Sequence, residues 1–361
     1  MAKQTHINVG GTWKSIKSVW QNVGGVWKQD VMLWRNVAAV WKECMSYIKV
    51  LSYYGTIASV NTSSTGGIAG TTLGEYVLFG CASYNTATTA YDKSLVKTSP
   101  TQVSYDRSNY GMASVGDYAL IVGGDRGGTK RTYVEAYNTS LVKSLPGNLS
   151  IARNYISGVS IGDYALFGGG VESNDVAGVY AYNTSLTRTT PTSLSVARNS
   201  IITASNGVHA FFVGGSESYA RVDAYNTSLT RTTATNLSIE RPYIAGASVG
   251  GYALFGGGRQ LVPEQDSNRV DAYNTSLTRT TATNLGLARE KLGGLSFPDY
   301  ALFVSGLSLY TWVTYVDAYT ASLVRETPTP VTQGALTFAT ATNGENAFWV
   351  SNYATHVYQY K

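Results

Sequence analysis

The residue types that most often hold metals or act as nucleophiles are scarce in this chain of 361 residues. Its two cysteines are too far apart for a zinc motif and too few for a disulfide framework. His209 takes a place that tyrosine fills in similar segments, which favours a structural role. We therefore expect no metal site, no cofactor, no catalytic residue and no enzymatic activity. The histidines are His6, His209 and His356, and the cysteines are Cys44 and Cys81.

Arginine is the chemically active residue that recurs at a regular position. Five arginines each follow a basic residue by ten positions and precede an apolar run. Such a series could form a cationic ring, but a residue present once per repeat usually serves the repeat itself. We favour the second interpretation, in which each arginine caps backbone carbonyl groups between neighbouring repeats. The five are Arg107, Arg153, Arg198, Arg241 and Arg289.

The elements that would position these arginines belong to a repeat of roughly 45 residues. Residues 163–170 read Asp-Tyr-Ala-Leu-Phe-Gly-Gly-Gly, and six further segments resemble them with increasing drift. Short apolar runs separated by Gly-Gly or Asn-Thr-Ser are typical of strands and turns, here four strands to a unit. One such sheet cannot bury both faces alone. The repeat therefore predicts seven sheets stacked around an axis, which is a β-propeller.

The spacing inside each unit identifies a family. A tyrosine in the third strand is followed six residues later by Lys or Arg, and only the second connection of each unit varies in length. Arginine, apolar strand, Gly-Gly and tyrosine, in that order, resemble the kelch repeat over residues 60–361. Kelch repeats usually carry tryptophan where this chain has Lys or Arg. We expect that basic stem to pack over the tyrosine ring, a cation–π contact of about 1 kcal/mol.

The two ends of the repeat array predict how the ring closes. The last unit stops just after Tyr358 and lacks an outer strand, whereas a spare strand lies near residues 53–58. Pairing these ends would remove an exposed sheet edge. The expected fold is all-β, a seven-bladed kelch-like β-propeller over residues 48–361, closed by an N-terminal strand.

Residues 1–47 form a separate segment with tryptophan every seven positions inside a fourteen-residue unit. Central Gly-Gly pairs argue against a coiled coil, because each glycine costs a helix about 1 kcal/mol relative to alanine. With Gly24 and Gly25 as a two-residue turn, Val23 faces Val26 in a β-hairpin. The segment is therefore expected to be a short β-hairpin repeat. Its tryptophans are Trp13, Trp20, Trp27, Trp34 and Trp41.

Two roles are open for these tryptophans. They could form a satellite hydrophobic cluster on the propeller's flank, or a docking or oligomerisation element covered by another protein. The unit resembles Trp-Lys repeats in tail-associated proteins of bacteriophages. This resemblance implies a virion component that contacts other virion proteins through the segment, with a homo-oligomer as a further option.

Charge and hydropathy limit the classes of partner that the chain is expected to bind. Six Lys and Arg stand against Asp30 and Glu43 in residues 1–48, so +4 of the net +5 lies there and the remainder is nearly neutral. No clustered basic patch of the kind that binds nucleic acid is therefore expected. No apolar stretch suits a signal peptide or a membrane span, so we expect synthesis in a bacterial host cytoplasm and no membrane insertion.

The loops between second and third strands are the expected binding elements, because length variation is confined to them. They should share one face with the links between blades. Several carry tyrosine, tryptophan or arginine, a combination that suits sugars, whose C–H faces stack on aromatic rings. The candidates are Tyr84, Arg126, Tyr219, Arg259, Tyr310, Trp312 and Tyr353.

The sequence thus predicts a non-enzymatic phage virion component, attached to a tail, baseplate or capsid. Its propeller would bind a host surface glycan or protein during adsorption. An intracellular kelch-like scaffold for protein–protein interaction is the first alternative. A propeller enzyme of the oxidase or glycosidase type is the second alternative, but the chain lacks both the sialidase Ser-x-Asp-x-Gly-x-Thr-Trp box and enough histidines for a copper site.

Overall fold

All elements in the described part of the chain are β-strands, and contacts divide the chain into two compact units, residues 1–51 and residues 52–360. The computed structural model describes residues 5–9, 12–16, 20–23, 26–29, 34–37, 40–43, 51–60, 67–82, 84–351 and 354–360.

The first unit contains three two-stranded antiparallel sheets with the same register. Val9 pairs with Thr12, Val23 with Val26, and Val37 with Val40. The predicted hairpins are therefore confirmed, including the pairing of Asn22 with Trp27. The strands are β1 (Thr5–Val9), β2 (Thr12–Ile16), β3 (Trp20–Val23), β4 (Val26–Gln29), β5 (Trp34–Val37) and β6 (Val40–Glu43).

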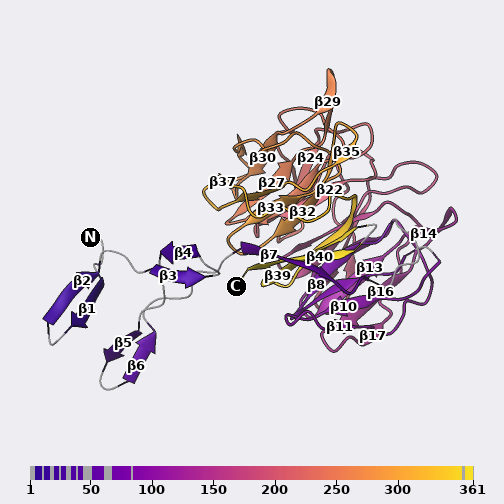
Figure 1. The fold of residues 1–361 in the computed structure, drawn as a ribbon. Coiled ribbons are helices and arrows are strands. Elements are labelled where there is room, and N and C mark those ends of the chain that lie inside the picture. Colours follow the sequence, from indigo (N-terminus) through magenta and orange to yellow (C-terminus); the bar gives the residue numbers. More distant parts are fainter. Residues whose placement is uncertain are drawn as a thin grey trace. The chain divides into compact units, whose positions relative to one another are not determined.

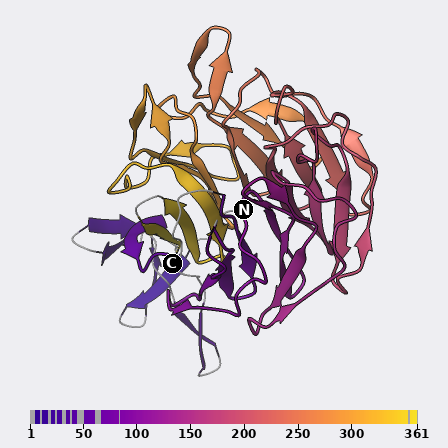
Figure 2. The same cartoon turned by 90° about the vertical axis from the view of Figure 1, so that its right-hand side faces the viewer.

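The second unit is a seven-bladed β-propeller, with each blade a four-stranded antiparallel sheet (Figures 1 and 2). Blade 1 holds β8 (Gly70–Leu73), β9 (Tyr76–Phe79), β10 (Thr89–Tyr91) and β11 (Lys97–Thr98). Blade 2 holds β12 (Gly111–Val115), β13 (Tyr118–Val122), β16 (Val134–Asn138) and β17 (Lys143–Ser144). Blade 3 holds β18 (Ser157–Ile161), β19 (Tyr164–Gly168), β20 (Val179–Asn183) and β21 (Arg188–Thr189).

The remaining blades repeat the same order from the inner strand outward. Blade 4 holds β22 (Ile202–Ser205), β23 (His209–Val213), β24 (Val222–Asn226) and β25 (Arg231–Thr233). Blade 5 holds β26 (Ala245–Val249), β27 (Tyr252–Gly256), β30 (Val270–Tyr273) and β31 (Arg279–Thr281). Blade 6 holds β32 (Gly293–Ser296), β33 (Ala301–Val304), β36 (Val316–Tyr319) and β37 (Arg325–Glu326). Blade 7 holds β38 (Thr337–Thr342), β39 (Asn346–Ser351), β40 (Thr355–Tyr360) and β7 (Leu51–Ile57).

The hydrophobic core is a set of clusters between adjacent blades. Leu120 and Val134 of blade 2, for example, share one cluster with Phe167 of blade 3. Inner strands approach closely enough to need glycine: a Cβ at Gly158 would lie 2.4 Å from the carbonyl oxygen of Met112. Each blade therefore has its faces covered by its neighbours, as the repeat predicted.

Blade 7 closes the ring as predicted, because β7 pairs with β40 and supplies the outer strand. The Tyr53 hydroxyl lies 3.2 Å from Nδ1 of His356, and its ring lies 5.4 Å from that of Tyr358. The His356 ring stacks on Trp349 at 4.6 Å, and its Nε2 lies 3.1 Å from Oγ of Ser351. This imidazole is only 1% exposed, and burial lowers its pKa from 6.5 to about 4.

Acid should therefore weaken the closing blade. A buried imidazole with a lowered pKa is compatible with the full stability of the fold only while it is neutral. The free energy of unfolding therefore decreases as pH falls from about 6.5, the ordinary pKa, to about 4, the pKa in the folded protein. We expect protonation of His356 to lower the free energy of unfolding by up to about 3 kcal/mol over that pH range. Urea denaturation of the wild type and His356→Gln at several pH values would measure this. Equal pH dependence in both proteins would contradict the prediction.

Candidate functional site

The five repeat arginines are buried inside the blades rather than arranged as a cationic ring. Each side chain is 2% exposed or less. Arg241 donates to the carbonyl of Phe255 on β27 at 3.0 Å and to Oδ2 of Asp271 on β30 at 2.8 Å. Both partners belong to blade 5, which Arg241 enters. The prediction that these side chains bridge neighbouring blades is therefore wrong, although the prediction that they cap carbonyls is confirmed.

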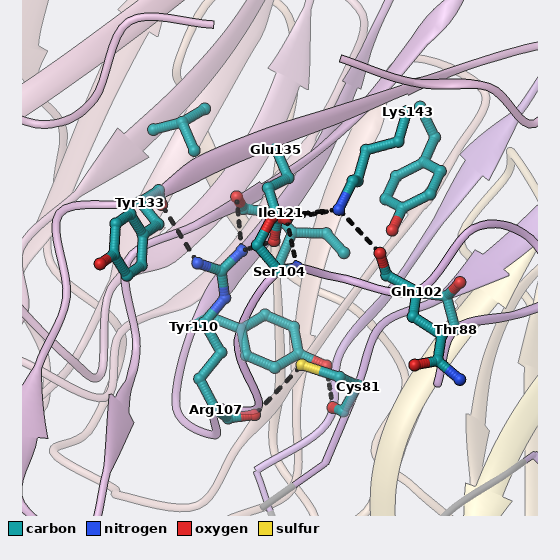
Figure 3. A network of polar contacts seen from close by, with 12 residues as sticks. Cys81, Thr88, Gln102, Ser104, Arg107, Tyr110, Ile121, Tyr133, Glu135 and Lys143 are labelled. Carbon is teal, nitrogen blue, oxygen red and sulfur yellow. Dashed lines mark hydrogen bonds and ion pairs between the residues drawn. The ribbon is translucent and has the colours of Figure 1, made fainter. Parts of the chain in front are cut away.

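The carboxylate partner is a repeat position that sequence reasoning missed. It lies two residues before the third-strand tyrosine, and its side chain is at most 1% exposed in each blade that has it. Arg107 binds Glu135 at 2.7 Å in blade 2 (Figure 3), and Arg198 binds Asp223 at 2.8 Å in blade 4. The full set is Glu135, Asp223, Asp271 and Asp317.

The outer basic residue approaches the same carboxylate from the fourth strand. Lys143 pairs in register with Tyr137, and its Nζ lies 3.3 Å from Oε1 of Glu135. The corresponding distance is 2.9 Å from Arg231 to Asp223. The charged groups of Lys143 and Arg231 thus have a carboxylate as partner, whereas the sequence predicted the tyrosine ring. The reason is that the carboxylate lies diagonally opposite on the neighbouring strand.

The Asp223 carboxylate is held in its charged form. Burial acts to raise the pKa of Asp223, but Arg198, Arg231 and the N–H of Ser195 outweigh it and lower that pKa. Blade 3 has Tyr180 at the position of the carboxylate, and the Arg153 guanidinium lies 4.7 Å from the centroid of its ring. The arrangement is a structural network in every described case.

The tyrosines and outer basic residues connect neighbouring blades. The Tyr137 hydroxyl donates to the carbonyl of Thr101 at 2.7 Å, and Lys143 donates to the next carbonyl, that of Gln102, at 2.8 Å. Thr101 lies on the link that leaves blade 1. Between blades 7 and 1, Tyr91 bonds the carbonyl of Ala58, just after β7. The other described tyrosines of the series bond the equivalent link: Tyr182, Tyr225, Tyr273, Tyr319 and Tyr358.

The candidate binding surface is the loop face, which we define as the end of the propeller with the second-to-third-strand loops and the links between blades. Three of these loops form small hairpins of their own. The longest projects from the propeller with β29 at its edge (Figure 1). The hairpin strands are β14 (Asp125–Arg126), β15 (Thr129–Lys130), β28 (Arg259–Leu261), β29 (Glu264–Asp266), β34 (Leu307–Ser308) and β35 (Thr311–Trp312).

The structure brings four of the predicted residues into two arginine–tyrosine pairs, each between adjacent blades. The Arg126 guanidinium lies 5.8 Å from the Tyr84 ring, and Arg259 lies 5.9 Å from the Tyr310 ring. Asp106 joins the first pair by binding Arg126 at 3.1 Å and accepting from the N–H of Tyr84 at 2.9 Å. Both tyrosines remain open to solvent, at 72% and 82% exposure.

The other predicted residues are placed differently. Trp312 pairs with Leu307 in the hairpin that carries Tyr310, and it is 36% exposed. Tyr219 lines a cavity of about 210 Å³ between blades 4 and 5. Tyr353 lies outside the described residues, as do the side chains of the five N-terminal tryptophans.

One ring of loop-face residues was missed by sequence reasoning. Two positions after each buried arginine, the backbone is left-handed although the residue is not glycine. There the N–H of Tyr155 donates to the carbonyl of Asn109, and that of Lys291 to the carbonyl of Tyr243. The residues are Asn109, Tyr155, Ser200, Tyr243 and Lys291. Their constant offset from the arginine series was the available signal.

The axis of the propeller contains cavities of about 350 and 260 Å³. Their lining consists mainly of backbone, aliphatic and hydroxyl groups on the inner strands or just before them, such as Ile156, Ile201 and Thr203, with Tyr110 and Met112. Among the described residues no group of three or more His, Cys, Asp or Glu side chains is placed to hold a metal ion. The part of the chain that is described has no helix that could span a membrane.

Solved structures share this fold. One of them, the structure of YjhT, aligns with a TM-score of 0.56 at 13% sequence identity, covering 76% of this chain and 99% of its own. At that identity the likeness shows the propeller architecture alone. No protein-family model and no curated protein matches the sequence.

Proposed function

We propose that the protein is a non-enzymatic component of a bacteriophage virion whose propeller binds a glycan or protein of the host surface. The observation that carries the binding role is the pair of exposed arginine–tyrosine contacts on the loop face. Aromatic rings fixed beside charged groups offer stacking and hydrogen bonding without a large loss of side-chain entropy.

The first unit, residues 1–51, is called the hairpin unit below, and its hairpins support the proposal that the protein is attached to a particle. Isolated two-stranded hairpins are marginally stable in water, and this unit repeats three of them with the same register. Covering by another protein would stabilise them, and tryptophan is enriched where proteins meet. The repeat's resemblance to phage tail-associated Trp-Lys repeats makes tail, baseplate or capsid the proposed location, with self-association as the alternative.

A kelch-like scaffold that binds a peptide on the same face is the second candidate. It is favoured by the apolar tips of the blade 5 and blade 6 hairpins, where Val262 is 86% exposed and Leu309 is 82% exposed. A peptide or protein partner would cover such tips, whereas a sugar would not require them.

Deleting residues 1–47 should separate the two proposed activities. We expect the shortened protein still to bind host cells but to be absent from purified particles assembled in its presence. Cell co-sedimentation and immunodetection on gradient-purified virions measure the two outcomes. Particle incorporation without the hairpin unit would contradict the docking role, and failure of the full chain to bind any cells would contradict the adhesion role.

A further inference from the structure

The cavity between blades 4 and 5 has the composition of a small-molecule site. Tyr219 enters it from the blade 4 loop and Tyr243 from the link into blade 5. Asn199, Ser200 and Ser216 supply polar groups to the same cavity. A concave site with a few placed polar groups between aromatic rings is typical of ligand recognition.

The polar groups of the cavity are already oriented by their neighbours. The side-chain amide of Asn199 donates to Asp175 at 2.7 Å and to Oγ of Ser216 at 3.2 Å. The hydroxyl of Ser200 donates to Oδ1 of Asn199 at 2.7 Å, which leaves the Ser200 oxygen as an acceptor. Such fixed groups bind a ligand hydroxyl with little further ordering.

Tyr243 is held as a platform. Its backbone is left-handed, with φ of 61°, and its carbonyl accepts from the N–H of Lys291 at 3.0 Å. The Lys291 ammonium lies 5.1 Å from the ring centroid, and the side chain remains about half exposed. The ring is therefore positioned by the backbone and accessible from solvent.

Charged groups continue from Tyr243 toward Tyr310 on blade 6. Lys291 lies 3.5 Å from Oε1 of Glu290, and Arg259 lies 3.9 Å from that oxygen. Glu290 is 2% exposed, and its Oε2 is buried without a hydrogen-bond partner. Arg259 then reaches the Tyr310 ring. The result is a strip in which aromatic rings alternate with charged groups.

Arg259 and Lys291 in the strip each have a carboxylate neighbour. Arg259 also binds Glu264 at 2.7 Å, so the two cations, Arg259 and Lys291, face the two carboxylates Glu290 and Glu264. An anionic ligand would have to compete with these carboxylates for the cations. A ligand that offers hydroxyl groups and apolar C–H faces meets no such competition.

We propose that this strip across blades 4–6 binds a neutral saccharide, an inference that rests on the proposed adhesion function. One sugar ring would occupy the cavity between Tyr219 and Tyr243, with hydroxyl groups bonded to Ser200 and Asn199. The adjoining sugar would reach Lys291, Arg259 and the Tyr310 ring.

The test uses the full chain and immobilised bacterial surface polysaccharides of known composition, both neutral and acidic, with binding followed by biolayer interferometry. Tyr243→Asn removes the ring but keeps a residue that tolerates left-handed backbone, as Asn109 does in blade 2. Tyr155→Asn is the matched control at the same repeat position of blade 3. Tyr219→Ala probes the other wall of the cavity.

We expect binding to at least one neutral polysaccharide that persists in about 0.5 M salt. Tyr243→Asn and Tyr219→Ala should each weaken it about tenfold, whereas Tyr155→Asn should not. Binding confined to acidic polymers, or equal binding by Tyr243→Asn, would overturn the proposal. If the protein bound host cells but none of the polysaccharides, the saccharide proposal would be overturned and the adhesion function would stand. If it bound neither cells nor polysaccharides, both the saccharide proposal and the adhesion function would be overturned.

Discussion

Replacement of Arg241 by methionine should lower the free energy of unfolding by about 3–5 kcal/mol. Asp271 would be left as a charge in a fully buried position, 0% exposed, because Arg279 lies 3.9 Å away and cannot replace the 2.8 Å contact with Arg241. The carbonyl of Phe255 would also lose its donor. Urea denaturation followed by circular dichroism would measure the change.

Blade 3 supplies the matched control for this prediction. It holds Arg153 against Tyr180 without a carboxylate. The variant Asp271→Tyr gives blade 5 the same pair of residues, and we expect it to cost less than about 2 kcal/mol. An Arg241→Met protein as stable as the wild type, or one no less stable than Asp271→Tyr, would argue against the buried charge as the source of the effect.

Removal of the closing strand is expected to have the other large effect. A chain that starts at residue 59 loses β7, so the edge of β40 becomes exposed and the contacts of Tyr53 with Trp349, His356 and Tyr358 disappear. We expect the midpoint of thermal unfolding to fall by about 10 °C or more, with aggregation at the open edge.

A chain that starts at residue 48 is the control, since it lacks the hairpin unit but keeps β7. Differential scanning calorimetry and size-exclusion chromatography of both shortened proteins would separate the two contributions. Equal stability of the two proteins would show that ring closure does not require β7.

Much of the fold could be predicted because its signals are local or repeated. The Gly-Gly pair at 24–25 predicted a two-residue turn, and the pairing of Val23 with Val26 has the register expected from it. The constant interval from Tyr137 to Lys143 places both residues on adjacent strands in direct register. Ring closure followed from counting strands at the two ends of the repeat array.

The candidate site was predictable only in part, because it depends on contacts between different blades. Tyr84 and Arg126 were each recognised as loop residues, but nothing in their separate loops indicates that they meet. Aspartate is seldom fully buried unless it is paired, and the partner of Asp271 is Arg241, which lies 30 residues earlier in the chain. Tyr243 was missed because the left-handed backbone at its repeat position is marked in the sequence only by a constant offset from the arginine series.

The tyrosine bond between blades has a consequence for the order of the chain. Every described seam uses the same hydroxyl-to-carbonyl contact, and the contact of Tyr91 with Ala58 between blades 7 and 1 spans about as many residues as the others. The two ends of the repeat array meet inside blade 7, between β40 and β7, so none of the seams between blades depends on where the chain starts. A circular permutation that joins β40 to β7 and opens the chain between the third and fourth strands of another blade would preserve every blade and every described interblade tyrosine contact, so the starting blade is a matter of genetic order and not of architecture.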